Sequence, residues 1–457
     1  MLHPAALAAD DIDPALRRIG PSLLRDTPHA SPARPITGEA PAGQDRLGLA
    51  EAALLAVQWH PRIAEAIGDL YKQGEGINVA RSGYYPQISG GLRGGYDTGS
   101  GGDRNSQALN LSLKQMLYDF GKVDYAVDAA NAAAARAQAN ILLVIDELAR
   151  ETAYAWIETQ RYAQLMDIAR AQITAVGDIV GLAQQRSDMG ASTRSDVVQA
   201  QSRADAAQAV FEEYQAQHQR WRAALATLLG RAAPPPLADA APAELDQGCQ
   251  RPLASDDRLP AVLMALAQRT QSQAELAQAK AEAYPTVSLQ PQINHYLDND
   301  YNRDNRRLDR TQAGIYLNVE VPIYQGGATS ARARAAGHAL SAADYAEDNA
   351  RLQARRGLAE AQAQTSGLGR RLRSLQLRQA SIQEARMLYG RQYLDLGTRP
   401  LLDLLNAEQE IYQSRFDMAA TRSDLLRLNV DCLYNNGALR PVLGLEGHRL
   451  QGVEILP

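Results

Sequence analysis

The sequence is built from two similar halves, and this duplication constrains the fold more than any other feature of the chain. Short motifs of the first half recur in the same order about 200 residues later, as repeated structural units do. Each half is therefore expected to supply the same set of elements to one architecture. The matching motifs are Tyr84-Tyr85-Pro86-Gln87-Ile88 and Ala283-Tyr284-Pro285-Thr286-Val287, Tyr118-Asp119-Phe120-Gly121 and Tyr324-Gln325-Gly326-Gly327, and Asp188-Met189-Gly190 and Asp395-Leu396-Gly397.

Each half predicts a helix, a β-hairpin, a very long helix, a break and a return helix. The first helix is expected from roughly Leu47 to Gly83. The long segment from Gly121 to Asp188 contains no proline, and as one helix it would be about 100 Å long, which indicates coiled-coil packing. The sequence accordingly divides into an extended N-terminal arm (1–46), a first repeat (47–230, hairpin 86–117), a linker (231–254), a second repeat (255–438, hairpin 285–323) and a C-terminal tail (439–457).

The two hairpins point to a sheet with one apolar face. Apolar and polar residues alternate along 109–114 and 313–321, which is typical of strands. Strands of about ten residues are long enough to cross a bilayer when they are tilted. Four strands cannot close a membrane barrel, since the smallest have about eight, and lipid does not tolerate open edges. Membrane strands would therefore require several copies of the chain. The alternative is a small soluble sheet packed on helices.

The composition fits long packed helices and excludes several other classes. Alanine, the strongest helix former, is abundant, whereas aromatic residues make up only 5%. A net charge of −5 gives no support for nucleic-acid binding, which needs a basic face. No apolar stretch is long enough to predict a transmembrane helix. Ala6-Leu7-Ala8 fits either the end of a signal peptide or an ordinary alanine-rich terminus.

The residues that could carry chemistry form no reactive cluster. Cys249 and Cys432 are the two cysteines, and they would form a disulfide in an oxidising compartment or remain as two buried thiols. The seven histidines are scattered without metal-ligand spacing. Gly121-Lys122 lacks the upstream glycine of a phosphate-binding loop. We therefore expect no enzymatic activity, no cofactor and no metal site.

The duplicated pattern of hairpin, long helix and glycine-containing turn resembles the TolC family of outer-membrane channel proteins. The likeness covers roughly Leu47 to Leu439. It implies a mainly α fold with a membrane part: a homotrimer with a twelve-stranded β-barrel, four strands from each subunit, and a periplasmic α-helical tunnel. It also implies an equatorial collar made from the linker and the C-terminal tail. The motifs that carry it most specifically are Tyr118-Asp119-Phe120-Gly121, Met189-Gly190-Ala191-Ser192, Asp196-Val197-Val198-Gln199-Ala200 and Leu396-Gly397-Thr398-Arg399-Pro400-Leu401-Leu402-Asp403.

The resemblance assigns a gate to the two turns that follow the long helices. In the family these turns form the periplasmic tip, where polar links hold the tunnel closed. By position, Arg399 resembles the tip arginine, and Ser195 and Asp196 resemble its polar partners. An arginine–carboxylate pair in water is weak and exchangeable, so an adaptor protein that binds the tip could shift it.

A ring of carboxylates at the entrance is also implied, with two departures from the family pattern. Asp403 matches the first acidic ring position, where three copies would attract cations. The second ring position holds Asn406, which weakens the expected constriction. The tyrosine position of the tip holds Leu394, with Tyr393 one residue earlier, so one closing link is in doubt.

The same turns are candidate docking surfaces. Gly190-Ala191 and Gly397-Thr398 would leave exposed backbone and small side chains, which in the family receive the hairpin tips of adaptor proteins. The simpler interpretation is helix punctuation, with glycine at each helix end and Pro400 near the next first turn.

The function implied is that of an outer-membrane channel subunit in a tripartite export system. Substrate would pass from an inner-membrane ABC transporter through a periplasmic adaptor to the exterior, in type I protein secretion. One alternative is a duct for efflux of small molecules driven by a proton-coupled pump. An alternative from another class is a periplasmic coiled-coil scaffold protein, which would not need the alternating strands.

Overall fold

The structure is a computed structural model that describes residues 46–97, 104–251, 258–297, 310–394, 397–447, 449–450 and 453–454. Several expectations lie outside these ranges. They concern the N-terminal arm up to residue 45, the two hairpin loops, and Asp395 and Leu396.

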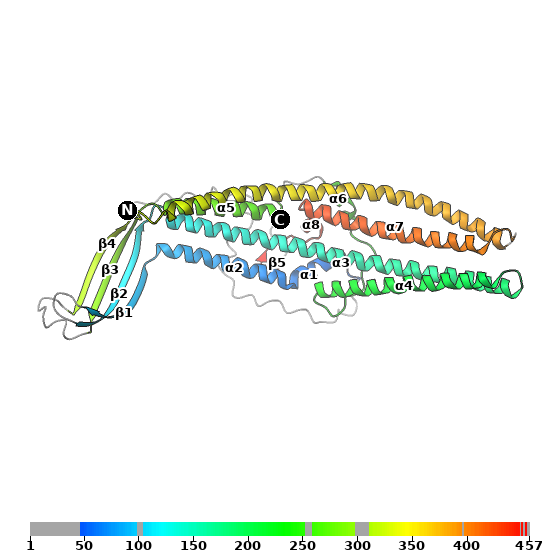
Figure 1. The fold of residues 1–457 in the computed structure, drawn as a ribbon, viewed down its shortest axis with the longest axis horizontal. Coiled ribbons are helices and arrows are strands. Elements are labelled where there is room, and N and C mark those ends of the chain that lie inside the picture. The colour runs from blue at the N-terminus through cyan, green and yellow to red at the C-terminus, as the bar shows by residue number, and fades with distance from the viewer. Residues whose placement is uncertain are drawn as a thin grey trace. The chain divides into compact units, whose positions relative to one another are not determined.

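The described elements are mostly helical, as predicted, and both halves run from helix through two strands and a long helix to a return helix (Figure 1). The strands form a four-stranded antiparallel sheet and a separate two-stranded one. The two long helices have 67 residues each and the two return helices 35 each, so the halves match in element length. The first half comprises α1 (Leu49–Trp59), α2 (Pro61–Arg81), the 3-10 helix η4 (Ser82–Tyr84), β1 (Gln87–Asp97), β2 (Arg104–Tyr118), α3 (Lys122–Asp188) and α4 (Arg194–Leu228). The second comprises the 3-10 helix η5 (Ala243–Gln250), α5 (Pro260–Ala281), β3 (Thr286–Tyr296), β4 (Thr311–Glu320), α6 (Ala328–Leu394) and α7 (Leu401–Asn435), followed by α8 (Leu439–Val442), β5 (Arg449–Leu450) and β6 (Val453–Glu454).

The helix expected from Leu47 to Gly83 is two helices. His60 has an extended backbone (φ −64°, ψ 133°) between α1 and α2, and Pro61 opens α2. The residue before a proline is driven out of the helical region, and proline lacks the N–H that would continue the ladder. The prediction of a single helix was wrong because it did not take Pro61 into account.

The beginning of α3 shows how a short motif fixes a helix start. The carboxylate of Asp119 is buried and accepts hydrogen bonds from the backbone N–H groups of Gly121 (3.0 Å) and Val123 (2.8 Å). These donors have no partner inside the helix, so a carboxylate there caps it and complements the helix dipole. Phe120 and Gly121 turn the chain from β2 into α3 with positive φ angles of 60° and 87°.

The four main strands form one antiparallel sheet in the order β1-β2-β3-β4, so β1 and β4 are its edges. The register aligns apolar residues of neighbouring strands on one face, whereas serine, asparagine and glutamine predominate on the other. The apolar side chains are exposed in the single chain. Aligned pairs are Leu92 with Leu109, Leu111 with Ile293, and Leu289 with Leu317; exposed members include Ile88, Leu92, Leu109, Leu111, Ile315, Leu317 and Val319.

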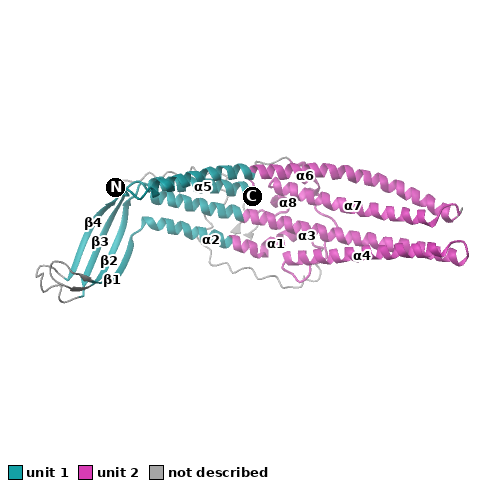
Figure 2. Ribbon diagram, in the orientation of Figure 1, with its two compact units in different colours: residues 1–17, 67–140, 261–350 teal, residues 18–66, 141–260, 351–457 magenta. Residues whose placement is uncertain are grey.

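The chain divides into two compact units, which we describe separately (Figure 2). Among the described residues, unit 1 comprises 67–140 and 261–350 and contains the four-stranded sheet. Unit 2 comprises the described residues before 67, together with those of 141–260 and 351–457, and contains both helix turns. None of the helices in the described ranges is both long and apolar enough to cross a membrane.

The core of unit 2 is made by small and aliphatic side chains of several helices. Ala52, Ala53 and Ala56 of α1 are fully buried, and their small side chains allow a close approach of neighbouring helices. Trp156 of α3 is buried as well, and its indole N–H donates to the carbonyl of Leu47 (3.1 Å). A large ring buried with its polar atom satisfied stabilises this region.

The linker of unit 2 lies against α7. A Cβ added to Gly248 would come within 2.6 Å of the carbonyl oxygen of Asn429, so only glycine fits this approach. The backbone N–H of the next residue, Cys249, donates a hydrogen bond to the side-chain oxygen of Asn429 (3.1 Å). The sequence left two states open for the cysteines, and in the structure Cys249 and Cys432 are joined by a disulfide.

Candidate functional site

The second turn, between α6 and α7, reverses the chain at Gly397. This residue has a φ of 62°, a left-handed conformation that glycine adopts without strain. The N–H of Thr398 closes the turn by donating to the carbonyl of Gln392 (3.1 Å). Gly397 and Thr398 are both exposed. The turn thus presents small exposed residues, and their role in docking stays a prediction.

Arg399 lies at the centre of this turn and has three partners. Its guanidinium donates to Asp403 (Nη1 to Oδ2, 2.7 Å) and to Gln392 (Nε to Oε1, 2.8 Å), and it lies 4.0 Å above the ring of Tyr389. Arg399 and Asp403 are each about one-third exposed (36% and 34%). The sequence did not single out Tyr389 or Gln392, although both lie within three turns of Arg399 along the chain.

The first turn, between α3 and α4, uses its carboxylate differently. Asp196 forms a capping box with Thr193, the residue before α4, and accepts a hydrogen bond from the Ser192 hydroxyl (2.6 Å). The hydrogen bond from Ser192, followed by those from Thr193, holds the pKa of Asp196 below its ordinary value despite slight burial. Ser195 is exposed and its hydroxyl lies 2.6 Å from that of Thr193. Gly190 has a φ of 70°, and the N–H of Ala191 donates to the carbonyl of Arg186 (2.7 Å).

The structure brings together only part of the predicted gate. Arg399 and Asp403 form an ion pair within one chain. Among the described residues, no hydrogen bond or ion pair joins Arg399 to Ser195 or Asp196, whose partners lie in their own turn. Asn406 accepts a long hydrogen bond from Arg203 of α4 (3.4 Å).

Both turns rest on one apolar cluster of unit 2. Its buried members come from four helices: Ile179 and Ala183 of α3, Ala200 of α4, Tyr393 of α6, and Leu401, Leu404 and Leu405 of α7. Arg186 lies 4.7 Å from the ring of Tyr393, which is the tyrosine one residue before the expected position. The two polar turns therefore project from a shared, well-packed base.

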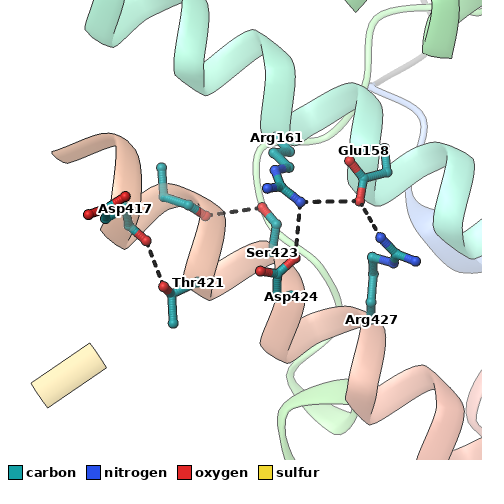
Figure 3. Close-up of polar contacts among 8 residues, drawn as sticks. Glu158, Arg161, Asp417, Thr421, Ser423, Asp424 and Arg427 are labelled. Atoms are coloured by element: carbon teal, nitrogen blue, oxygen red, sulfur yellow. Dashed lines mark hydrogen bonds and ion pairs between the residues drawn. The ribbon is translucent and has the colours of Figure 1, made fainter. Parts of the chain in front are cut away.

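Farther along α3 and α7, a polar network links the two helices (Figure 3). Glu158 of α3 is almost fully buried and accepts from Arg427 of α7 (3.0 Å), while Arg161 lies 3.5 Å from the same carboxylate. Arg161 also donates to Asp424 of α7 (3.0 Å). Both arginines therefore form an ion pair between α3 and α7, and both lie near the carboxylate of Glu158. The buried charge of Glu158 is thereby compensated.

The charged and polar side chains of the two turns form local hydrogen bonds and one ion pair. Within the described ranges, no group of three or more His, Cys, Asp or Glu side chains could hold a metal ion. Carboxylates and guanidinium groups at the turns form hydrogen bonds and ion pairs with one another.

Comparison with solved structures defines the class of fold. The outer membrane protein VceC from Vibrio cholerae superposes with a TM-score of 0.73 and 19% identity, covering 85% of this chain and 96% of VceC. At that identity, the similarity establishes the fold alone. Among relatives, the alkaline protease secretion protein AprF of Pseudomonas aeruginosa is 27% identical over 71% of this chain and 68% of AprF. The outer membrane efflux protein BepC of Brucella suis is 25% identical over 78% of this chain and 77% of BepC.

The family follows from the sequence itself. The model of the family described as outer membrane efflux protein matches residues 54–231 and 255–431. This chain belongs to that family, and its location is the outer membrane. The predicted resemblance and the predicted location are both confirmed.

Proposed function

We propose that three copies of this chain form the outer-membrane duct of a tripartite export system. Their sheets would join into a twelve-stranded barrel, and their long helices would form a periplasmic tunnel with an equatorial collar from the linker and tail. One observation carries the proposal: the four-stranded sheet has an exposed apolar face across all strands and two unpaired edges.

Such a sheet is stable in lipid only when its edges are closed. Backbone groups left unpaired in hydrocarbon cost several kcal/mol each, so β1 and β4 need partners there. The apolar face suits contact with acyl chains, and the polar face suits a water-filled lumen. Three copies supply twelve strands in total, within the range of known membrane barrels.

Type I protein secretion is the transport process we favour. AprF, whose name describes protease secretion, is similar over most of both chains. An inner-membrane ABC transporter and a periplasmic adaptor would then be the partners. BepC is named as an efflux protein, so small-molecule efflux with a proton-driven pump is the second candidate.

We further assign the gate to the two turns of unit 2. Arg399 and Asp403 would form the exchangeable lock at the tunnel entrance, since their ion pair is partly solvated and local. Ser195, Asp196 and Asn406 would contribute polar contacts as neighbouring subunits approach. Docking of the adaptor would use the exposed residues Gly190, Ala191, Gly397 and Thr398.

Paired substitutions on opposite faces of β2 test the barrel. Leu111→Arg places a charge on the apolar face, whereas Asn110→Arg places the same charge on the polar face. Arginine facing lipid costs about 2–4 kcal/mol at the bilayer midplane, so Leu111→Arg should sharply reduce outer-membrane trimers. Asn110→Arg should retain them. Equal trimer yields, measured by native mass determination in detergent, would contradict the lipid-facing assignment.

A deletion strain tests the transported substrate. Loss of the chain should abolish export of a protein substrate whose gene neighbours an ABC transporter, and complementation should restore it. Accumulation of small toxic compounds with unchanged protein secretion would instead support the efflux alternative.

A further inference from the structure

The structure contains one complete junction between strand and helix in unit 1, at the end of β2. Phe120 stacks on Tyr284, which precedes β3, with ring centroids 5.5 Å apart and planes at 19°. Tyr118 packs edge-on against Phe120 at 4.7 Å. The chain leaving β2 is thereby held by aromatic contacts to the chain entering the neighbouring strand.

A cationic tether reinforces the same junction. The ammonium group of Lys122, at the first position of α3, donates to the carbonyl of Tyr284 (2.8 Å) and to the hydroxyl of Thr286 (2.7 Å). Charged donors make the stronger class of hydrogen bond, and this lysine joins two segments far apart in sequence. We call the contacts of residues 118–122 with 284–286 the internal clasp.

The end of β4 has similar φ angles, but among the described residues it has no such aromatic or lysine contacts. Gly326 and Gly327 have φ angles of 62° and 84°, close to the 60° and 87° of Phe120 and Gly121. The preceding side chains are bare, with Ile323 94% exposed and Tyr324 85% exposed. The duplicated turn therefore forms, while none of the described residues covers the apolar side chains that precede it.

The opposite edge of the sheet, at β1, has the residues that correspond to the other half of the internal clasp. Tyr85 precedes β1 at the position that Tyr284 occupies before β3, and it is 64% exposed. Within one chain β1 and β4 are separated by β2 and β3, so these two segments cannot meet. The internal repeat thus leaves two unpaired halves of a clasp on the two open edges.

We propose that residues 323–327 dock on Tyr84 and Tyr85 of a second copy of this chain, in the arrangement of the internal clasp. This inference rests on the proposed assembly and names the residues of its seam. Gly326 provides no ring at the position of Phe120, so Ile323 and Tyr324 cover Tyr85 of the second copy. Ala328 stands at the position of Lys122, so the seam also lacks the cationic tether.

The register of the sheet supports the pairing independently. Transferring the β2–β3 register to β4 and the β1 of a second copy places Val319 opposite Leu92. Both lie on the apolar face, so that face continues across the seam. A shift by one residue would have set apolar against polar faces, because side chains alternate along a strand.

A cysteine pair tests the seam directly. Directly opposed residues have Cβ atoms about 4.5–5.5 Å apart, so Leu92→Cys with Val319→Cys should yield covalent trimers on mild oxidation. Within one chain the register sets Leu92 level with Thr311, three strand spacings (about 14 Å) away, and Val319 lies eight residues (about 27 Å) farther along β4, which excludes an internal link. The control, Leu92→Cys with Val321→Cys, shifts the pair by two residues and should link much less.

The mass of the wild-type protein in detergent separates the two hypotheses. A trimer without links in the registered pair overturns the seam and leaves the proposed channel intact. A monomer overturns both.

Transplanting the internal clasp tests its missing parts. Gly326→Phe with Ala328→Lys should raise the temperature at which trimers dissociate, because it adds the ring and the tether. Phe120 already holds a φ of 60° at the equivalent site, so phenylalanine is tolerated in this backbone. Gly326→Ala alone serves as the strain control. A dissociation temperature no higher than that of the strain control would count against the docking.

Discussion

The middle of unit 2 and its two helix turns both bring charged groups together, but they do so under opposite conditions. In the middle, the side chain of Glu158 is 4% exposed and shares two arginines between α3 and α7. At the second turn, Arg399 and Asp403 lie four residues apart on the surface of one segment. The first arrangement fixes two helices to each other, whereas the second can open without disturbing the core.

The difference follows from solvation. A buried charge that loses its partner remains desolvated, so breaking such a pair costs several kcal/mol. An exposed pair exchanges its partner for water at almost no cost. We therefore expect the middle to set stability and the turns to set the state of the entrance.

The disulfide should contribute a large stabilising effect in the middle region. It joins residues 183 apart in sequence, and a cross-link that closes a long loop stabilises by restricting the unfolded chain. Replacing Cys249 and Cys432 together with serine should lower the free energy of unfolding by about 3 kcal/mol. Urea unfolding in detergent measures this free energy. A reductant should destabilise the wild type as much as the double substitution does, and it should leave the variant unchanged. A wild type whose stability does not respond to reductant would contradict the predicted role of the disulfide.

Glu158→Gln should come next. The variant leaves two arginines near a neutral amide, but Arg427 is 41% exposed and Arg161 keeps Asp424, so we expect about 2 kcal/mol rather than the full cost of a buried charge. The matched control is Glu360→Gln, which breaks an exposed pair with Arg356 and should change stability by less than about 0.5 kcal/mol. If both variants lose similar unfolding free energy, buried and exposed ion pairs do not differ in their contribution to stability as we expect.

Asp146 should give the middle region a dependence on pH. Burial raises its pKa to about 7, while Arg440 opposes this shift and Glu446 and Glu147 add to it. Because the folded pKa exceeds the unfolded one, the folded state binds more protons between about pH 4 and pH 7. Stability from this group therefore falls as pH rises, by at most about 1.4 kcal/mol per unit.

The matching variant is Asp146→Asn, which cannot titrate. Its free energy of unfolding should gain on that of the wild type as pH rises from about 4 to 7. Parallel profiles for the two proteins would show that Asp146 keeps the same pKa in both states.

At the second turn, Arg399→Ser should barely change stability, by less than about 0.5 kcal/mol, because the pair is exposed. The resting conductance in planar bilayers should nevertheless rise, since the entrance loses its lock. Arg356→Ser, at another exposed pair on α6, serves as the control and should leave conductance unchanged. If the conductance of the variant is as low as that of the wild type, Arg399 has no role in the gate.

The smallest expected effect belongs to Asp403→Ala. It should leave unfolding unchanged and weaken block of the channel by multivalent cations, since three carboxylates around an axis attract them. The control is Glu360→Gln, which removes an exposed carboxylate from the middle of α6 and should leave block intact. If Asp403→Ala and the wild type are blocked equally, the acidic ring lies elsewhere.

Local patterns predicted what depends on neighbours in sequence. The alternation along β2 and β4 indicated one apolar face. The break at Pro61 could also have been read from the sequence, because proline disfavours a helical residue before it. Contacts between residues far apart in the sequence could not be predicted. Arg427 and Glu158 are 269 residues apart, and no sequence pattern pairs those two positions.

The sequence by itself determined the duplication, the mostly helical class, the four alternating strands and the positions of both glycine turns, because these depend on local propensity and period. Only the tertiary structure decided which charges are buried and which cysteine state holds. Those outcomes depend on which helices pack together. The two aspartates near equivalent helix starts, Asp196 and Asp403, differ for a local reason instead: the residues a few positions before them make one a cap and the other half of an ion pair.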